Sequence, residues 1–301
     1  MHNQLNMHNV VKTILTAFII ITVIVNTSCS NIKRQETTII AVTNKIYIST
    51  DWGSETIDFE VSNTEKVKIG IIDSSNNYAS DNIECYSTVK TSAENSFGHG
   101  SYTTAIMSSL LPKSNILSIN AANEKGEITE ETLCDSIKYA IEKNCDIINM
   151  SLGTQCNYPE LESIIKYAVE RGIIIIAAAG NNFKKTLDYP AAYKDVISVI
   201  SRNIDNIDVK SNNVSLLKKS FSAPDSIVFN ENIIVDGSSV ATVYATAVVA
   251  SIKAQLPQSN ISEINNLLKK TSVFSTDYSY GMINYKRIVN TINKGDFTNG
   301  Q

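Results

Sequence analysis

The sequence of 301 residues has little of several residue types, and each shortage excludes a class of protein. It has only 5 prolines and no repeats, which argues against a disordered or repetitive chain. Its net charge is -4 and no run of Lys and Arg exceeds a pair, so we expect no nucleic-acid binding. No G-x-G-x-x-G or Walker sequence follows an apolar run, which disfavours a nucleotide-binding protein.

Cysteine and histidine are also scarce. Four cysteines follow the N-terminal segment, namely Cys85, Cys134, Cys145 and Cys156. They form no C-x-x-C pair, so a zinc site or redox motif has no support, and the spacing does not reveal any disulfide pairing. We expect four unpaired, partly buried thiols. Of the 3 histidines, His2 and His8 lie near the start, which leaves His99 as the only imidazole of a processed protein.

The first 29 residues have the composition of an export segment. Lys12 precedes a mostly apolar run at 13–25, which is short for a membrane span of about 20 residues and fits a signal-peptide core. Ser28-Cys29 resembles the lipobox of bacterial lipoproteins, although Asn26 stands where Leu is preferred. We expect an exported, extracytoplasmic protein attached to a bacterial membrane through lipidated Cys29. Plain signal cleavage and an uncleaved anchor are the alternatives.

The rest of the chain divides into a polar N-terminal arm at 30–66 and one domain at 67–295. The arm contains two short β-like pieces, at 38–42 and 45–48. In the domain, apolar runs alternate with amphipathic segments. Strands are expected at 67–73, 115–120, 145–153, 173–180 and 196–200, and helices at 130–143, 159–172 and 262–270. This alternation predicts an α/β fold with a mainly parallel sheet and helices on both faces, whose functional residues follow the strands.

Residues 233–256 hold a short apolar strand, a Gly-Ser-Ser turn and a helix almost without charge. A helix with no polar face is expected to be buried. Ser239 lies at the positive end of this helix, where negative charge is stabilised next to a hydroxyl. A serine at a helix start is ordinarily an N-cap, so the turn alone does not decide between a cap and a nucleophile.

Other polar residues follow the predicted strands or open a helix. Asp73 ends one apolar run, Asn181 follows another, and His99 stands between two glycines at a predicted helix start. A serine hydrolase needs a base for the hydroxyl proton, an acid that orients the base, and a donor for the oxyanion. These residue types are all present, in the order Asp, His, Ser that is found in subtilisin.

Seven short blocks in family order make the chain similar to the subtilisin family of serine proteases, family S8, over about 67–289. They are IGIIDSS, GHGSYTTAI, INMSLG, AAAGN, SAP, DGSSVAT and YGMIN. The resemblance implies a three-layer subtilisin-like fold with a buried central helix that starts at the nucleophile. It also implies a serine endopeptidase that acts on a peptide or protein substrate.

The resemblance assigns a role to each residue of the set. Asp73 would orient His99, His99 would activate Ser239 as general base, and Asn181 would hold the oxyanion. Substrate backbone would pair with the segment Ser151, Leu152 and Gly153, with Gly126 in the opposing edge strand. Structural calcium is common in the family, but no metal site is assignable here and the chemistry requires no cofactor.

The family pattern also changes after the acid, at Ser75, and after the histidine, at Ser101 and Tyr102. The most visible departures lie close to the nucleophile, where Val243 replaces a proline and Tyr244 a common histidine. The alternative to an active protease is therefore a catalytically inactive binding lipoprotein of the same fold. Residues 30–72 are too few for both a folded pro-domain and an arm. Some small members of the family, including leader peptidases that mature lanthipeptide-type bacteriocins, lack a pro-segment. We expect a monomer with a dedicated processing role.

An acidic cluster flanks the expected edge strand, and it consists of Glu124, Glu127, Glu130 and Glu131. It hints that basic residues are accepted upstream of the cut bond. The simpler interpretation is that acids collect in the first turn of a helix, where they interact favourably with its dipole.

Overall fold

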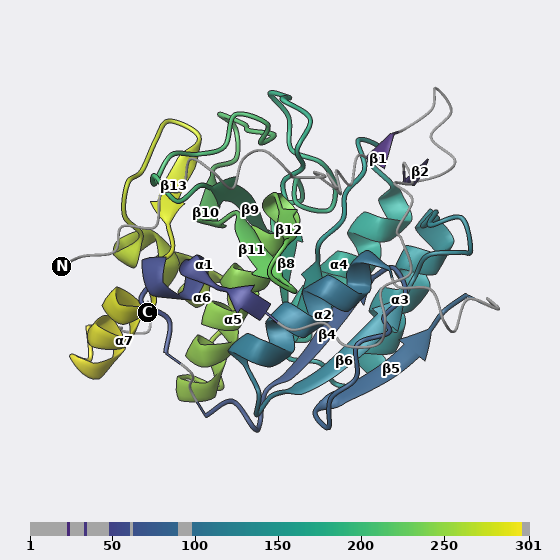
Figure 1. Ribbon diagram of the computed structural model, residues 1–301, viewed down its shortest axis with the longest axis horizontal. Coiled ribbons are helices and arrows are strands. Elements are labelled where there is room, and N and C mark those ends of the chain that lie inside the picture. The colour runs from purple at the N-terminus through teal and green to yellow at the C-terminus, as the bar shows by residue number, and fades with distance from the viewer. Residues whose placement is uncertain (1–22, 25–32, 35–47, 61–62, 90–97, 297–301) are drawn as a thin grey trace.

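A parallel sheet lies at the centre of the protein, whose computed structural model describes residues 23–24, 33–34, 48–60, 63–89 and 98–296. Its eight strands run in the order β13-β10-β9-β8-β7-β4-β6-β5 (Figure 1). These strands are β4 (Lys68–Asp73), β5 (Ile83–Ser87), β6 (Asn115–Asn120), β7 (Ile147–Met150), β8 (Ile174–Ala178), β9 (Ile197–Arg202), β10 (Ser220–Pro224) and β13 (Ser279–Met282). Every pair in this sheet is parallel.

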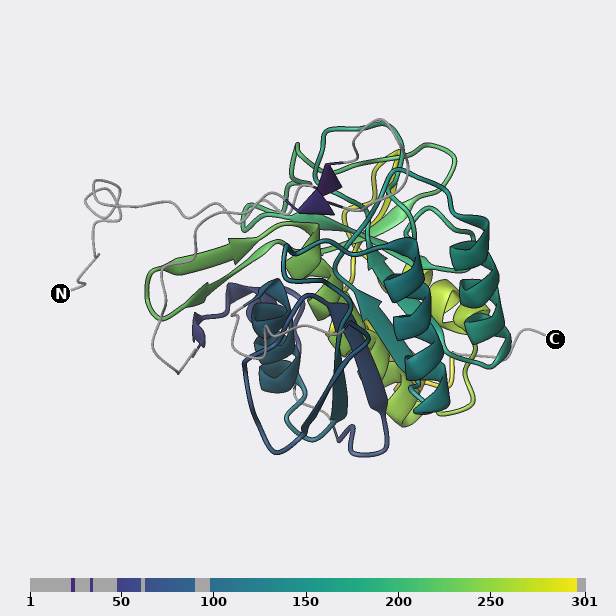
Figure 2. The same cartoon turned by 90° about the vertical axis from the view of Figure 1, so that its right-hand side faces the viewer.

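Two smaller sheets and the helices complete the described fold. One antiparallel sheet joins β12 (Ile233–Asp236), β11 (Ser226–Phe229) and β3 (Ile48–Thr50), and the other pairs β1 (Val23–Ile24) with β2 (Lys33–Arg34). The helices are α1 (Trp52–Thr56), α2 (His99–Leu110), α3 (Glu130–Glu142), α4 (Pro159–Glu170), α5 (Ser238–Gln255), α6 (Ile261–Thr271) and α7 (Tyr285–Asn293). Helices α3 and α4 lie side by side on one face of the sheet (Figure 2), and α2 and α5 pack on the other.

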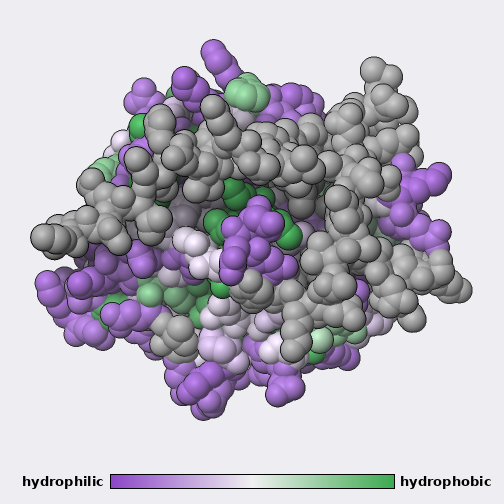
Figure 3. All heavy atoms as spheres, viewed as in Figure 1, coloured by the Kyte–Doolittle hydropathy of each residue, from purple (hydrophilic) through white to green (hydrophobic). Residues whose placement is uncertain are grey.

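The core lies on both faces of the central sheet because successive side chains of a strand point to opposite faces. In β4, Ile69 and Ile71 join the cluster that packs under α2 and α5, whereas Ile72 joins the cluster under α3 and α4. Strands that are covered on both faces have nearly continuous apolar sequences, as the sequence predicted. The described surface in Figure 3 is mostly hydrophilic, with hydrophobic residues in small patches.

Helix α5 runs through the centre of the protein. Every residue from Ser238 to Lys253 is buried, and the helix contacts β7, β8, β9 and β10 as well as α2. The absence of a polar face in its sequence is thus explained by contacts on all sides. The expected buried central helix is confirmed.

The predicted strands and helices of the domain are confirmed within a few residues. The segment 220–229 is divided between β10 of the central sheet and β11 of the three-stranded sheet. Of the expected arm, the stretch 48–60 packs on the domain, and Ile57 belongs to the core cluster that includes residues of α5. The β-like piece 38–42 and the export segment, apart from β1, lie outside the described residues. No helix in the described ranges has the length and apolarity needed to cross a membrane.

The expectation of four unpaired thiols is wrong for one cysteine. Cys156 is bonded in a disulfide, whereas Cys85, Cys134 and Cys145 are free. Cys134 and Cys145 are buried and Cys85 is exposed. Pairing depends on which cysteines the fold brings together, and cysteine spacing alone carries no such information here.

Candidate active site

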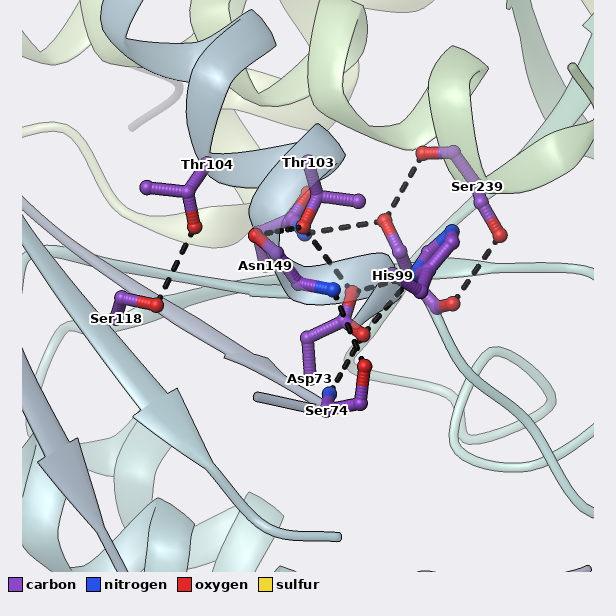
Figure 4. Close-up of polar contacts among 10 residues, drawn as sticks. Asp73, Ser74, His99, Thr103, Thr104, Ser118, Asn149 and Ser239 are labelled. Atoms are coloured by element: carbon purple, nitrogen blue, oxygen red, sulfur yellow. Dashed lines mark hydrogen bonds and ion pairs between the residues drawn. The ribbon is translucent and has the colours of Figure 1, made fainter. Parts of the chain in front are cut away.

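Three elements bring the candidate residues to one edge of the central sheet. Strand β4 ends on Asp73, α2 begins at His99, and Ser239 is the second residue of α5. The carboxyl ends of parallel strands meet at one edge of a sheet, and helices that follow them begin there. Figure 4 shows His99 between Asp73 and Ser239.

The imidazole of His99 is held by the carboxylate of Asp73. His99 Nδ1 lies 2.9 Å from Asp73 Oδ1 and 2.8 Å from Oδ2, and both residues are buried. The carboxylate also accepts hydrogen bonds from Ser74 N at 2.6 Å and from Thr103 Oγ1 at 3.2 Å. A carboxylate on Nδ1 favours the tautomer with its proton there, which leaves Nε2 as the acceptor.

The two glycines that flank His99 allow the start of α2 to approach the loop after β4. A Cβ on Gly100 would lie 2.2 Å from Ser74 O, and a Cβ on Gly98 would lie 2.6 Å from Ser75 O. Real Cβ atoms do not come that close to backbone atoms, so a larger residue would displace the helix. The glycines therefore bring His99 to Asp73 by permitting backbone contact.

Ser239 is not the N-cap of its helix. Gly237 occupies the N-cap position with a φ of 101°, which favours glycine, and no side chain caps the helix. The Ser239 hydroxyl donates a hydrogen bond to Ser151 O at 3.2 Å, and Ser151 Oγ donates to Ser239 O at 2.9 Å. The Ser239 hydroxyl must therefore leave Ser151 O before it can donate to His99, a rearrangement that is common when an active site holds no substrate.

Asn181 lies next to the start of α5. Its Oδ1 accepts a hydrogen bond from Ser238 N at 3.1 Å. Because the carbonyl end of the amide is held in this way, the amide nitrogen is the end available to a ligand. In the described part of the chain this nitrogen makes no hydrogen bond, and it lies 3.0 Å from the position of a Cβ on Gly237.

A pocket joins Asn181 and the start of α5 to the segment that follows β7. It is lined by Ser151, Leu152, Gly153, Ala178, Gly180, Asn181, Asn182, Asp188, Ser238 and Ser239. The structure thus brings the predicted segment 151–153 together with Asn181 and Ser239. This segment follows the end of β7 without being a strand itself.

Gly126 does not belong to this site. It lies in a turn with a φ of 74°, closed by a hydrogen bond from its N–H to Asn123 O at 2.9 Å, and it does not line the pocket. The expectation of an edge strand at Gly126 is therefore wrong. The left-handed turn connects Ala122 to Ile128, which form an isolated antiparallel bridge. Glu130 and Glu131 occupy the first turn of α3, in line with the simpler interpretation of the acidic cluster.

Asp188 is the pocket residue that the sequence analysis missed. Burial raises the pKa of its carboxyl group to about 6, and the charge of Lys184 and the amide of Asn213 oppose this effect. An acid before a Tyr-Pro pair is typical of an ordinary loop, so no sequence pattern marked Asp188 as a residue of the site. Within the described ranges, no group of three or more His, Cys, Asp or Glu side chains could hold a metal ion, and no calcium site is assigned.

Comparisons with known proteins identify the family of the chain. The model of the subtilase family, peptidase family S8, matches residues 42–290. A thermophilic serine proteinase of Bacillus sp. (strain AK1) is 31% identical over 183 residues, which are 58% of this chain and 45% of that protein. Subtilisin DY of Bacillus licheniformis is 26% identical over 207 residues, which are 62% of this chain and 76% of that protein. The chain thus covers less than half of the first relative and about three quarters of the second.

Solved structures show the same fold. The protease domain of PatA, solved as an alanine mutant, has a TM-score of 0.67 at 17% identity, over 78% of this chain and 98% of that chain. The prenylagaramide maturation protease PagA has a TM-score of 0.64 at 19% identity, over 75% of this chain and 93% of that chain. The parallel sheet with helices on both faces is therefore a subtilisin-like fold. Because the family model matches more than half of the sequence, the chain belongs to the subtilase family.

Proposed function

We propose that the protein is a serine endopeptidase with Ser239 as nucleophile, His99 as general base and Asp73 as the residue that orients His99. The observation that carries this proposal is the double contact of His99 Nδ1 with the buried Asp73 carboxylate, beside a serine at the start of α5. A hydroxyl, a base and an orienting acid in this arrangement form the activated nucleophile of acyl-transfer enzymes.

The chemistry follows from these positions. His99 Nε2 takes the proton of Ser239 Oγ while the oxygen attacks the carbonyl carbon of the substrate and forms a tetrahedral intermediate. The same proton passes to the leaving amine as the peptide bond breaks and an acyl-enzyme remains. Water, deprotonated by His99, then attacks the ester carbon and releases the new carboxylate and the Ser239 hydroxyl.

The oxyanion of both intermediates would be stabilised by two donors. The Ser239 N–H lies at the positive end of α5, and the Asn181 amide nitrogen faces the same pocket because Ser238 N holds the Asn181 carbonyl. Loss of an oxyanion-hole asparagine lowers turnover by on the order of 10² to 10³, a magnitude known from subtilisin itself. We expect the same order for Asn181→Ala.

The location and substrates of the enzyme are a further part of the proposal. The export segment at 1–29 supports an extracytoplasmic enzyme that is anchored through lipidated Cys29 and processes an exported peptide or protein. PagA, which shares the fold, is a maturation protease. A lipid on the Cys29 thiol excludes a disulfide of that thiol, so mass spectrometry of unreduced protein purified from its own cells tests the lipid anchor against a bond between Cys29 and Cys156. Rapid and unselective degradation of casein by the purified protein would contradict a dedicated processing role.

Labelling with a fluorophosphonate probe separates an active protease from an inactive binding protein. We expect the wild-type protein to be labelled and Ser239→Ala not to be. Ser251→Ala is the matched control, because Ser251 is a buried serine of the same helix, far from the pocket. Equal labelling of wild type and Ser239→Ala, or no labelling of the wild type, would overturn the proposal.

A further inference from the structure

Among the described residues that line the pocket beside Ser239, Asp188 is the one with a charged side chain. Its position is fixed by backbone hydrogen bonds to both walls of the pocket. Asp188 N donates to Ala179 O at 3.0 Å at the end of β8, and the next residue, Tyr189, exchanges backbone hydrogen bonds with Thr154 beyond β7. The carboxylate is therefore carried by a rigid segment.

The carboxylate is buried without a full set of partners. Asp188 is only 3% exposed, and its Oδ1 has no hydrogen-bond partner among the described residues. No ion pair joins Asp188 to any cation within those residues, and the pocket lining contains neither Lys nor Arg. A buried carboxylate without a direct ion-pair partner is costly, so a group of this kind calls for a function.

Two glycines make room for this side chain. A Cβ on Gly180 would lie 2.3 Å from Asp188 Oδ2, and a Cβ on Gly153 would lie 2.9 Å from Asp188 Cβ. Any larger residue at either position would displace the carboxylate. Both glycines belong to the pocket lining, so the walls of the pocket are shaped around an acid.

We propose that Asp188 determines substrate specificity by pairing with the cationic side chain of a lysine or arginine on the acyl side of the cleaved bond. This inference rests on the proposed function, because it needs Ser239 as the nucleophile. The pocket is shared by Ser239 and by the proposed oxyanion donor Asn181, so the side chain next to the attacked carbonyl is the one that enters it.

A cation is favoured over other side chains by the chemistry of the pocket. An ammonium or guanidinium group would give Asp188 Oδ1 the partner that it lacks and would neutralise the buried charge. An acidic side chain would be repelled, and an aliphatic one would leave the carboxylate desolvated and unpaired. Truncating one partner of a buried charge pair changes binding by on the order of 30-fold or more.

Cleavage of matched peptides tests the inference. A peptide series that carries arginine, citrulline, lysine, norleucine or leucine before the cut bond separates charge from shape, because citrulline is the neutral analogue of arginine. We expect kcat/KM for arginine over citrulline to be about 30-fold or higher in the wild type. In Asp188→Asn the ratio is expected to fall to within a few-fold of 1. Asp205→Asn, which removes an acid from an exposed position outside the pocket, is expected to leave the ratio unchanged.

The outcomes distinguish this inference from the proposed function. Absence of both fluorophosphonate labelling and cleavage would overturn the serine protease itself. A labelled, active enzyme that cleaves after citrulline as readily as after arginine would overturn the role of Asp188 alone, as would a preference that Asp188→Asn leaves intact. Fluorophosphonate labelling of Asp188→Asn shows that the variant is folded, and Asp188→Ser replaces it if it is not.

Discussion

The hydroxyl of Tyr244 on α5 donates a hydrogen bond to the carboxylate of Asp51, 193 residues earlier in the chain. The Tyr244 ring also packs against α1, where a Cβ on Gly53 would lie 2.4 Å from Tyr244 Cζ. Tyr244 is one of the residues that depart from the family pattern, and another, Val243, is fully buried in the core. Tyr244 thus links the segment before the domain to the central helix.

Tyr244→Phe is expected to lower the free energy of unfolding by about 1.5 kcal/mol, because it removes a buried hydrogen bond to a charged group. The loss stays at the low end of the range because Asp51 also accepts hydrogen bonds from Ser54 N at 3.0 Å and Ser54 Oγ at 2.6 Å. Urea denaturation measures this loss in the free energy of unfolding, in a Ser239→Ala background that prevents self-cleavage. The exposed Tyr167→Phe is the control, and an equal effect of both changes would contradict the role of Asp51.

Thr103 is expected to position the Asp73 carboxylate. Thr103→Val removes a hydrogen bond to a charged group and should lower kcat by roughly 3- to 30-fold with little change in KM. Thr103→Ser should restore most of the activity because it keeps the hydroxyl. The neighbouring Thr104→Val is the matched control, since Thr104 Oγ1 contacts Ser118 Oγ at 3.3 Å and not the carboxylate (Figure 4). A change in KM with kcat unaltered would refute a positioning role.

The sequence predicts those elements whose patterns are dictated by burial. Strand β6 was predicted with its observed bounds, because an apolar run between polar turns is what a strand covered on both faces requires. Strand β5 was missed because it lies at the edge of the sheet with most of its residues exposed, so its sequence has no apolar run. Helix α1 is too short to give a helical period.

The candidate site was predictable to the extent that local sequence carries its chemistry. Asp73, His99 and Ser239 are each marked by a strand end, flanking glycines or a helix start, and these signals depend on near neighbours. The role of Asp188 depends instead on its burial between Gly153 and Gly180, which lie in the loops that follow β7 and β8. The residues next to an acid in a loop do not indicate such tertiary contacts.

Lys218 is expected to be a structural hydrogen-bond donor. Its Nζ donates to the carbonyl oxygens of Ala191 at 2.6 Å, Val196 at 2.8 Å and Tyr193. Lys218→Met would leave these carbonyls without their donor, and we expect a loss of about 3 kcal/mol in the free energy of unfolding. Lys219→Met is the matched control, because Lys219 Nζ donates to a single carbonyl, Thr276 O. Thermal unfolding in the Ser239→Ala background compares the two, and similar melting temperatures would contradict this role.

The raised pKa of Asp188 predicts a pH dependence of stability. Burial raises the pKa of this carboxyl from 3.8 to about 6, so the folded protein binds its proton more tightly than the unfolded chain. The contribution of Asp188 to the free energy of unfolding is therefore fully present below about pH 4. This contribution falls by on the order of 2 to 3 kcal/mol as pH rises through about 6. Asp188→Asn in the Ser239→Ala background should remove this fall. Parallel stability curves for the two proteins between pH 4 and 7 would show that Asp188 does not titrate there.

The same titration should appear in substrate selectivity. Only the ionised carboxylate attracts a cation, so the ratio of kcat/KM for arginine over citrulline should rise with pH through about 6 and level off above it. Because the ratio compares two peptides on the same enzyme, any effect of pH on catalysis that both peptides share cancels. A cationic substrate also stabilises the ionised form, so kcat, which reports the bound state, should change at lower pH than kcat/KM. A ratio that is constant from pH 5 to 8 in the wild type, with Asp188→Asn behaving identically, would exclude charge pairing at Asp188.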